Sequence, residues 1–132
     1  MSLELERIDH VGIALLDMDA GLRLYEGDLG MPLVHREVVE VQGVDAALLD
    51  VGDGHIELLV PLSGESPVGK FIDNRGEGMH HVAYAVGEIE SAMEAVAAAG
   101  MELIDPEPRI GIRNSRTAFV HPKTALGELI EL

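Results

Sequence analysis

The stretch GMHHVAYAV, residues 78–86, is repeated from an earlier segment of the chain, RIDHVGIAL at residues 7–15. The two copies align when His81 is placed on His10. Read as strands, both copies send their bulky apolar residues to one face, and the other face carries the histidine followed only by glycine or alanine. Such a face leaves space beside the imidazole. The repeat therefore predicts two equivalent strands, each with one side for the core and one side for a ligand or a metal.

The segments after these two strands also repeat. The first module, residues 7–61, is predicted to hold a helix between Asp17 and Gly30 and strands at 33–41, 44–50 and 55–60. A connection at 62–78 contains a short helical stretch, PVGKFIDN. The second module, 79–132, is predicted to hold a strand at 79–86, a helix at 89–99 and strands at 101–104, 117–121 and 127–132. We therefore expect an α+β protein of two tandem βαβββ modules in a curved mixed sheet.

Two glutamates occupy the same place in the closing strands of the modules. Glu57 follows His10 by 47 residues, and Glu131 follows His81 by 50 residues. If the first and last strands of each module adjoin, each histidine has a glutamate beside it, and stacked modules bring all four side chains together. Two imidazoles and two carboxylates suit a divalent ion such as Co, Ni, Zn, Mn or Mg. The alternative is that the histidines are ordinary strand residues and the glutamates are solvent-exposed.

Composition limits the possible functions. The 132 residues are 47% hydrophobic, which is enough for one domain, and the absence of cysteine excludes a disulfide, a thiolate metal site and a cysteine nucleophile. The net charge of −15 argues against general nucleic-acid binding. No apolar run approaches the roughly 20 residues of a membrane span, and the acidic start MSLELE does not resemble a signal peptide. We therefore expect a cytoplasmic protein with no membrane partner.

The charge is unevenly distributed. Residues 1–66 hold three basic and fourteen acidic side chains, whereas 67–132 hold six and ten. Three of the nine basic residues, Arg109, Arg113 and Arg116, fall within eight positions. This segment is either a solvated loop or a local anion site on an otherwise acidic surface.

Several motifs resemble the vicinal-oxygen-chelate superfamily and, within it, the methylmalonyl-CoA epimerases. These motifs are IDHVGIA, EVQGV, IELLVPL, SPVGKF followed by NRGEGMHHVAYAV, FVHPK and the final IEL. The resemblance covers nearly the whole chain and implies a glyoxalase-like fold, a homodimer and metal ligands at His10, Glu57, His81 and Glu131. Many epimerases have glutamine in place of Glu57. The glutamate in this chain makes its ligand set more similar to that of glyoxalase I.

The resemblance implies a reaction as well: epimerisation at C2 of methylmalonyl-CoA by proton abstraction and a metal-stabilised enolate. Glu131 would serve as ligand and base. Some bacterial epimerases place a second base where this chain has Ala46, which leaves Glu57 or Asp45 as the candidate for that role. Asp45 and Ala46 face opposite ways by alternation, so Asp45 is not a simple replacement.

By the same resemblance, part of the arginine-rich segment contacts the substrate. The candidates to hold the substrate carboxylate or the coenzyme phosphates are Arg113, Ser115, Arg116 and Lys123.

Three other functions within the superfamily share features of this site. A glyoxalase I-type isomerase (lactoylglutathione lyase) would use the same four ligands on a glutathione hemithioacetal. An extradiol dioxygenase needs two histidines and one carboxylate around Fe(II), so a fourth ligand at Glu57 argues against it. A non-catalytic small-molecule-binding protein of the bleomycin-resistance kind commonly lacks the complete ligand set.

Overall fold

The computed structural model describes residues 3–132, and its contacts divide them into two compact units. The N-terminal unit comprises residues 10–80, and the C-terminal unit comprises residues 3–9 and 81–132. Strand β1 (Arg7–Ala14) therefore begins in one unit and continues in the other. Each unit combines helix with strands that pair in both parallel and antiparallel directions, so the predicted α+β class is confirmed.

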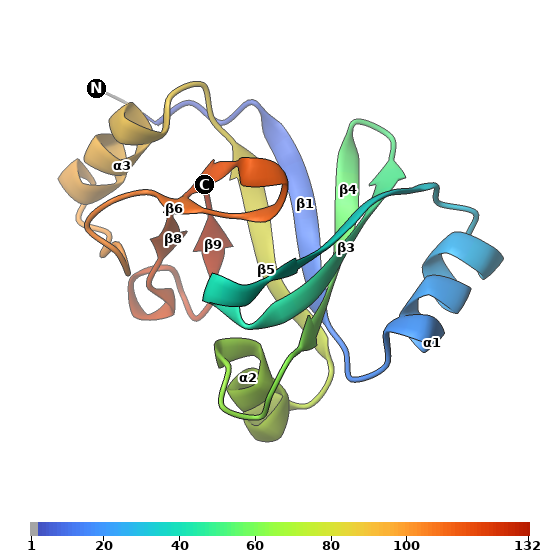
Figure 1. Ribbon diagram of the computed structural model, residues 1–132. Helices are drawn as coiled ribbons and strands as arrows, with labels where there is room; N and C mark the ends of the chain where they lie inside the picture. The colour runs from blue at the N-terminus through green and yellow to red at the C-terminus, as the bar shows by residue number, and fades with distance from the viewer. Residues whose placement is uncertain (1–2) are drawn as a thin grey trace. The chain divides into compact units, whose positions relative to one another are not determined.

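The sheet of the N-terminal unit has the strand order β2-β3-β4-β1 (Figure 1). β2 and β3 pair antiparallel, as do β3 and β4, whereas β4 and β1 are parallel. The three further strands span Leu33–Val39 (β2), Val44–Val51 (β3) and Gly54–Pro61 (β4). Their positions agree with the predicted strands to within a few residues.

The predicted helix between Asp17 and Gly30 is present but irregular. Helix α1 (Met18–Leu22) is followed by a π-helix, η1 (Arg23–Asp28). The Asp17 side chain caps α1 by accepting a hydrogen bond from the Ala20 N–H at 3.2 Å, as expected. The apolar spacing indicated the position of the helix but not the wider π turns.

Helix α1 and the π-helix cover one face of the N-terminal sheet. Met18 packs with Ile13, Ala47, Leu49 and Leu58 in a buried cluster, as the alternation in the first strand predicts. The side chains of the opposite face alternate with these residues, and His10 and Glu57 are among them.

The connection between β2 and β3 is fixed by a glycine. After the 3₁₀ turn η2 (Glu40–Gln42), Gly43 adopts a φ of +68°, and a Cβ at this position would lie 2.8 Å from Cβ of Ser66. Ser66 is itself the N-cap of α2 (Pro67–Arg75), where its Oγ accepts a hydrogen bond from the Gly69 N–H at 3.1 Å. The predicted QG turn and the predicted helical stretch in the connection are thus both present and in contact.

The C-terminal unit contains strands in the order β5-β9-β8. β5 and β9 are parallel, and β9 and β8 are antiparallel. Ile89, Met93 and Val96 of the helix bury against Ala118 and Val120. The elements are β5 (Gly78–Ala85, of which residues 81–85 belong to this unit), α3 (Ile89–Ala98), β8 (Phe119–Val120) and β9 (Ile130–Glu131).

The later strands of the C-terminal unit are less regular than predicted. The strand expected at 101–104 is an isolated bridge between Leu103 and Val120. Proline lacks the N–H that a longer ladder needs, and Pro106 and Pro108 follow directly. The strand expected at 127–132 begins only at Ile130, because Gly127 takes a φ of +87°.

The remaining elements of the C-terminal unit are short. They are β6 (Arg109–Ile110), η3 (Ile112–Asn114), β7 (Arg116–Thr117) and η4 (Pro122–Thr124). No helix within residues 3–132 has the length and apolar character needed to cross a membrane.

Candidate functional site

A buried histidine and a buried glutamate meet on adjacent strands of the N-terminal unit. His10 lies on β1 and Glu57 on β4, where the Cα partner of Glu57 is Gly12. Nε2 of His10 is 3.4 Å from Oε1 of Glu57, and both residues are only 6% exposed. Gly12 adds no side chain beside this pair.

The C-terminal unit contains the equivalent pair. His81 lies on β5 and Glu131 on β9, and the Cα partner of Glu131 is Ala83. Nε2 of His81 is 2.8 Å from Oε1 of Glu131, and both residues are 6% exposed. The ring of Phe119 meets the His81 ring edge-on with 5.7 Å between centroids, which supports the imidazole orientation.

The two pairs have the same register. In each unit the glutamate is the partner of the residue two positions after the histidine. The predicted adjacency of histidine and glutamate is therefore confirmed within each unit.

The chemistry of these pairs fits a divalent metal. A buried carboxylate is costly unless it is paired or coordinates a metal. His10, His81 and Glu131 each offer one buried nitrogen or oxygen atom suited to ligate a metal ion, and Glu57 offers the same kind of donor. Imidazole nitrogens and carboxylate oxygens are the donors that borderline and hard divalent ions prefer.

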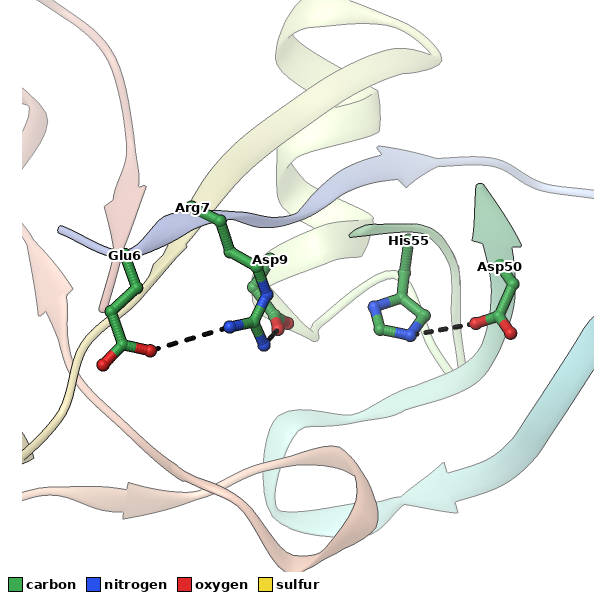
Figure 2. A network of polar contacts seen from close by, with 5 residues as sticks. All are labelled: Glu6, Arg7, Asp9, Asp50 and His55. Carbon is green, nitrogen blue, oxygen red and sulfur yellow. Dashed lines mark hydrogen bonds and ion pairs between the residues drawn. The ribbon is translucent and has the colours of Figure 1, made fainter. Parts of the chain in front are cut away.

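The site-facing side of the N-terminal sheet holds two further histidine–carboxylate pairs that the sequence analysis missed. On β2, Nε2 of His35 is 2.8 Å from Oε1 of Glu37. Nε2 of His55 is 3.0 Å from Oδ1 of Asp50, and Figure 2 shows these two side chains directed toward each other. The spacing His-x-Glu in a predicted strand was a usable signal, because alternation sends both residues to one face.

The segment 6–9 of the C-terminal unit contains a small group of charged side chains. Figure 2 shows Arg7 reaching toward Glu6 and Asp9, at 3.6 Å and 3.3 Å. These are exposed contacts at the start of β1, and they contribute little to stability.

Asp45 lies away from the buried pair of its unit. Its carboxylate accepts hydrogen bonds from Arg36 at 2.9 Å and 3.3 Å, and this hydrogen bond raises the pKa of the Arg36 guanidinium. Alternation along β3 places Asp45 on the side of Ala47 and Leu49, opposite Glu57. The geometry therefore does not support Asp45 as the second base, the role for which Glu57 was the alternative.

The predicted substrate-binding cations lie on the surface of the C-terminal unit. Arg116 is ion-paired with Glu90, and Lys123 Nζ is 3.0 Å from Glu102. These hydrogen bonds lower the pKa of both carboxyls. Nε of Arg109 lies 2.7 Å from Oδ2 of Asp105. The cations thus already have carboxylate partners that an anionic ligand would have to replace.

The other two predicted substrate residues lie in the η3 turn between β6 and β7. Arg113 has a φ of +56°, and the Ser115 hydroxyl donates a hydrogen bond to the carbonyl of Ile112 at 2.8 Å. This internal hydrogen bond holds the turn in shape. The substrate roles of both residues stay predictions.

Comparison with known proteins gives a consistent result. The model of the Glyoxalase/Bleomycin resistance protein/Dioxygenase superfamily matches residues 9–119. An ethylmalonyl-CoA/methylmalonyl-CoA epimerase from Cereibacter sphaeroides is 34% identical, over 96% of this chain and 96% of that protein.

Solved structures agree with this result. The methylmalonyl-CoA epimerase of Mycobacterium tuberculosis is 40% identical with a TM-score of 0.95, covering 100% of this chain and 89% of that one. A variant of the Streptomyces coelicolor methylmalonyl-CoA epimerase in complex with 2-nitronate-propionyl-CoA is 38% identical with a TM-score of 0.94, covering 98% of this chain and 94% of that one. The expected glyoxalase-like fold is confirmed.

Proposed function

Because the chain belongs to the glyoxalase/bleomycin resistance protein/dioxygenase superfamily, we propose that it is an epimerase that inverts C2 of methylmalonyl-CoA. The observation that carries this proposal is the pair of buried histidine–glutamate contacts in equivalent register. Similarity to named epimerases over nearly the whole chain supports the same substrate class.

The metal ligands in this proposal are His10, Glu57, His81 and Glu131, which together hold one divalent ion of Co, Ni, Zn, Mn or Mg. Bound to these side chains, the ion supplies positive charge for the thioester oxygen as it becomes negative, an effect worth several kcal/mol. The four residues offer the donors for this role, and their burial keeps water away from the developing charge.

Proton transfer is assigned first to Glu131. Its carboxylate lies 2.8 Å from His81, which orients it, and it is buried in a site where a base is well protected from water. Inversion requires the proton to leave one face of C2 and return to the other. A second acid–base group is therefore necessary, and Glu57 is the candidate among the four ligands.

The substrate anions are assigned to Arg113, Ser115, Arg116 and Lys123. Arg116 and Lys123 have side chains that are 52% and 64% exposed. An incoming phosphate or carboxylate would exchange with Glu90 or Glu102, whose exposed ion pairs are weak. Substitution of Arg116 by glutamine should then raise KM for methylmalonyl-CoA while the metal content stays unchanged. A loss of metal with an unchanged KM would contradict this assignment.

A glyoxalase I-type isomerase is the second candidate. It is favoured by the carboxylate at Glu57, which completes a set of two histidines and two glutamates. Activity with methylglyoxal and glutathione, but none with an acyl-CoA, would select it. The homodimer and the cytoplasmic location remain expectations.

The deciding experiment is proton NMR of methylmalonyl-CoA in heavy water, with metal-loaded and chelated enzyme. We expect metal-dependent exchange of the C2 proton and interconversion of the epimers, with one metal ion per chain by elemental analysis. No exchange under either condition would reject the epimerase function. Metal-free enzyme that exchanges the proton at the full rate would reject the metal site.

A further inference from the structure

We infer that Glu37, oriented by His35, is the second acid–base group of the epimerisation, on the part of the site that the N-terminal unit builds. This inference rests on the proposed function and names a residue that the sequence reasoning did not consider. Inversion at C2 requires two proton-transfer groups: one group takes the C2 proton, and another delivers a proton to the opposite face.

The strand register puts Glu37 on the same face as Glu57. Glu37 on β2 is the Cα partner of Ala46 on β3, and His35 is the partner of Leu48. Leu48 in turn is the partner of Glu57 on β4. His35, Leu48 and Glu57 therefore form one row across three strands, and Glu37 stands in the next row.

The spacing of these rows suits a bound acyl group. Two strand separations of about 4.8 Å and one pleat of about 7 Å put the Cα atoms of Glu37 and Glu57 roughly 12 Å apart. Ala46 lies beside Glu37, and Gly12 and Ala14 continue the face on β1. The methyl group of Ala46 takes little volume beside Glu37, whereas the buried Leu48 stands between His35 and Glu57 in the neighbouring row.

The His35 contact fits the assigned chemistry. Nε2 of His35 lies 2.8 Å from Oε1 of Glu37, and both side chains are 34% exposed. The imidazole orients the carboxylate, and the exposure allows the carboxyl to exchange its proton with solvent between turnovers. Glu57 serves as a metal ligand in the proposed function.

Other carboxylates of the N-terminal unit fit less well. Asp45 is held by Arg36 on the opposite side of β3. Asp50 is on the correct face, but its side chain is 48% exposed and contacts His55 in the end row of the sheet. Glu37 is therefore the best placed of the three carboxylates on β2 and β3 for a second proton transfer.

In the proposed step, the Glu37 carboxylate takes the C2 proton of one epimer. The C–H bond breaks, an O–H bond forms on Glu37, and the electron pair moves into the thioester to give the enolate. A protonated carboxyl on the other face, assigned to Glu131, then delivers its proton to C2. The opposite epimer reacts by the reverse sequence, so no oxidant or co-reactant is needed.

The test is Glu37→Gln in the metal-loaded protein, with epimerisation and C2 hydrogen–deuterium exchange followed separately from each pure epimer of methylmalonyl-CoA. We expect epimerisation to fall at least about 100-fold. One epimer should still exchange its proton with retention, because the base on the other face remains, while the second epimer stops exchanging. Metal content should equal that of the wild type. Glu40→Gln, an exposed carboxylate three residues away, is the matched control and should change neither rate.

Two further variants separate chemistry from folding. Glu37→Asp keeps the carboxyl and should recover part of the lost epimerisation. His35→Asn should shift the ratio of exchange between the two epimers in the same direction as Glu37→Gln, but less. The inference is overturned if Glu37→Gln epimerises within about threefold of the wild type, or loses exchange from both epimers equally. A wild type that exchanges neither epimer would instead remove the proposed function, and this inference with it.

Discussion

The two units carry the same histidine–glutamate pair on unequal frameworks. In the N-terminal unit the glutamate stands in an eight-residue strand, whereas in the C-terminal unit it stands in a two-residue strand. The C-terminal pair is nevertheless the shorter contact, 2.8 Å against 3.4 Å. The register of the pair has thus been kept while the strands around it diverged.

The surroundings of the pairs differ in chemistry as well. The N-terminal sheet adds two more histidine–carboxylate pairs on the site-facing side. The C-terminal unit instead displays arginine and lysine in exposed ion pairs. Under the further inference the N-terminal unit adds one proton-transfer group, Glu37, and under the proposed function the C-terminal unit adds anion-binding groups.

The strongest test of this comparison exchanges the two glutamates for glutamine. Glu131→Gln should lower the epimerisation rate by about 10³-fold, since it removes a base. Glu57→Gln should lower it only about tenfold, because Glu37 is inferred to be the second base and an amide oxygen can still ligate a metal. Steady-state kinetics and metal analysis of both variants measure this. Equal losses would mean that the two pairs have equivalent roles.

The hydrophobic clusters give the next test. Leu58→Ala in the N-terminal unit should lower the free energy of unfolding by about 3 kcal/mol, and Val96→Ala in the C-terminal unit by about 2 kcal/mol, because both side chains are buried and the cavity left by leucine is larger. Urea unfolding checks both values. Leu126→Ala, at a side chain that is 101% exposed, is the control and should change stability by less than about 0.5 kcal/mol.

Substitution of Asp45 is expected to have a smaller effect on stability and on the epimerisation rate. If its carboxylate serves only Arg36, Asp45→Asn should cost about 0.5 to 1 kcal/mol of stability and leave the epimerisation rate within about threefold of the wild type. Thermal unfolding and kinetics together decide this. A rate loss near 100-fold at unchanged stability would restore Asp45 as a base.

The smallest effect concerns Glu90, whose pKa is lowered by its hydrogen bond to Arg116. A lowered pKa in the folded state contributes stability above the unfolded value of 4.5, and this contribution is lost as the pH falls through the folded pKa. Glu90→Gln should therefore have a slightly lower Tm than the wild type at pH 7, and this difference in Tm should disappear at acidic pH. Glu94→Gln, an exposed carboxylate on the same helix, should show no such pH-dependent difference. A difference that grows in acid would contradict the ion pair.

Local patterns in the sequence predicted the repeated parts of the fold well. Alternation after His10 and His81 identified the strands, their core faces and the adjacent glutamates. The pairing of β2 with β3 was visible only as a turn at Gln42-Gly43, so the row that joins Glu37 to Ala46 could not be derived. Cross-strand register depends on tertiary packing, which one-dimensional periodicity does not encode.

The structure of the irregular regions could not be predicted from the sequence for a different reason. In the segment after α3, proline removes hydrogen-bond donors and several residues take positive φ, including Arg113 at +56° and Leu126 at +58°. Apolar residues such as Ile104 suggest a longer strand, but the pairing in this segment is limited to the Leu103–Val120 bridge and the two-residue strands β6 and β7. Ion-pair partners such as Glu90 for Arg116 lie 26 positions apart in the sequence, beyond any local pattern.

The shared register has a practical consequence for protein engineering. Since each glutamate is placed by its neighbour in a parallel strand pair, the length of the intervening chain is free to vary, as the separations of 47 and 50 residues already show. Residues can therefore be inserted at the β3–β4 turn or around residues 105–108 while the two histidine–glutamate pairs keep their places.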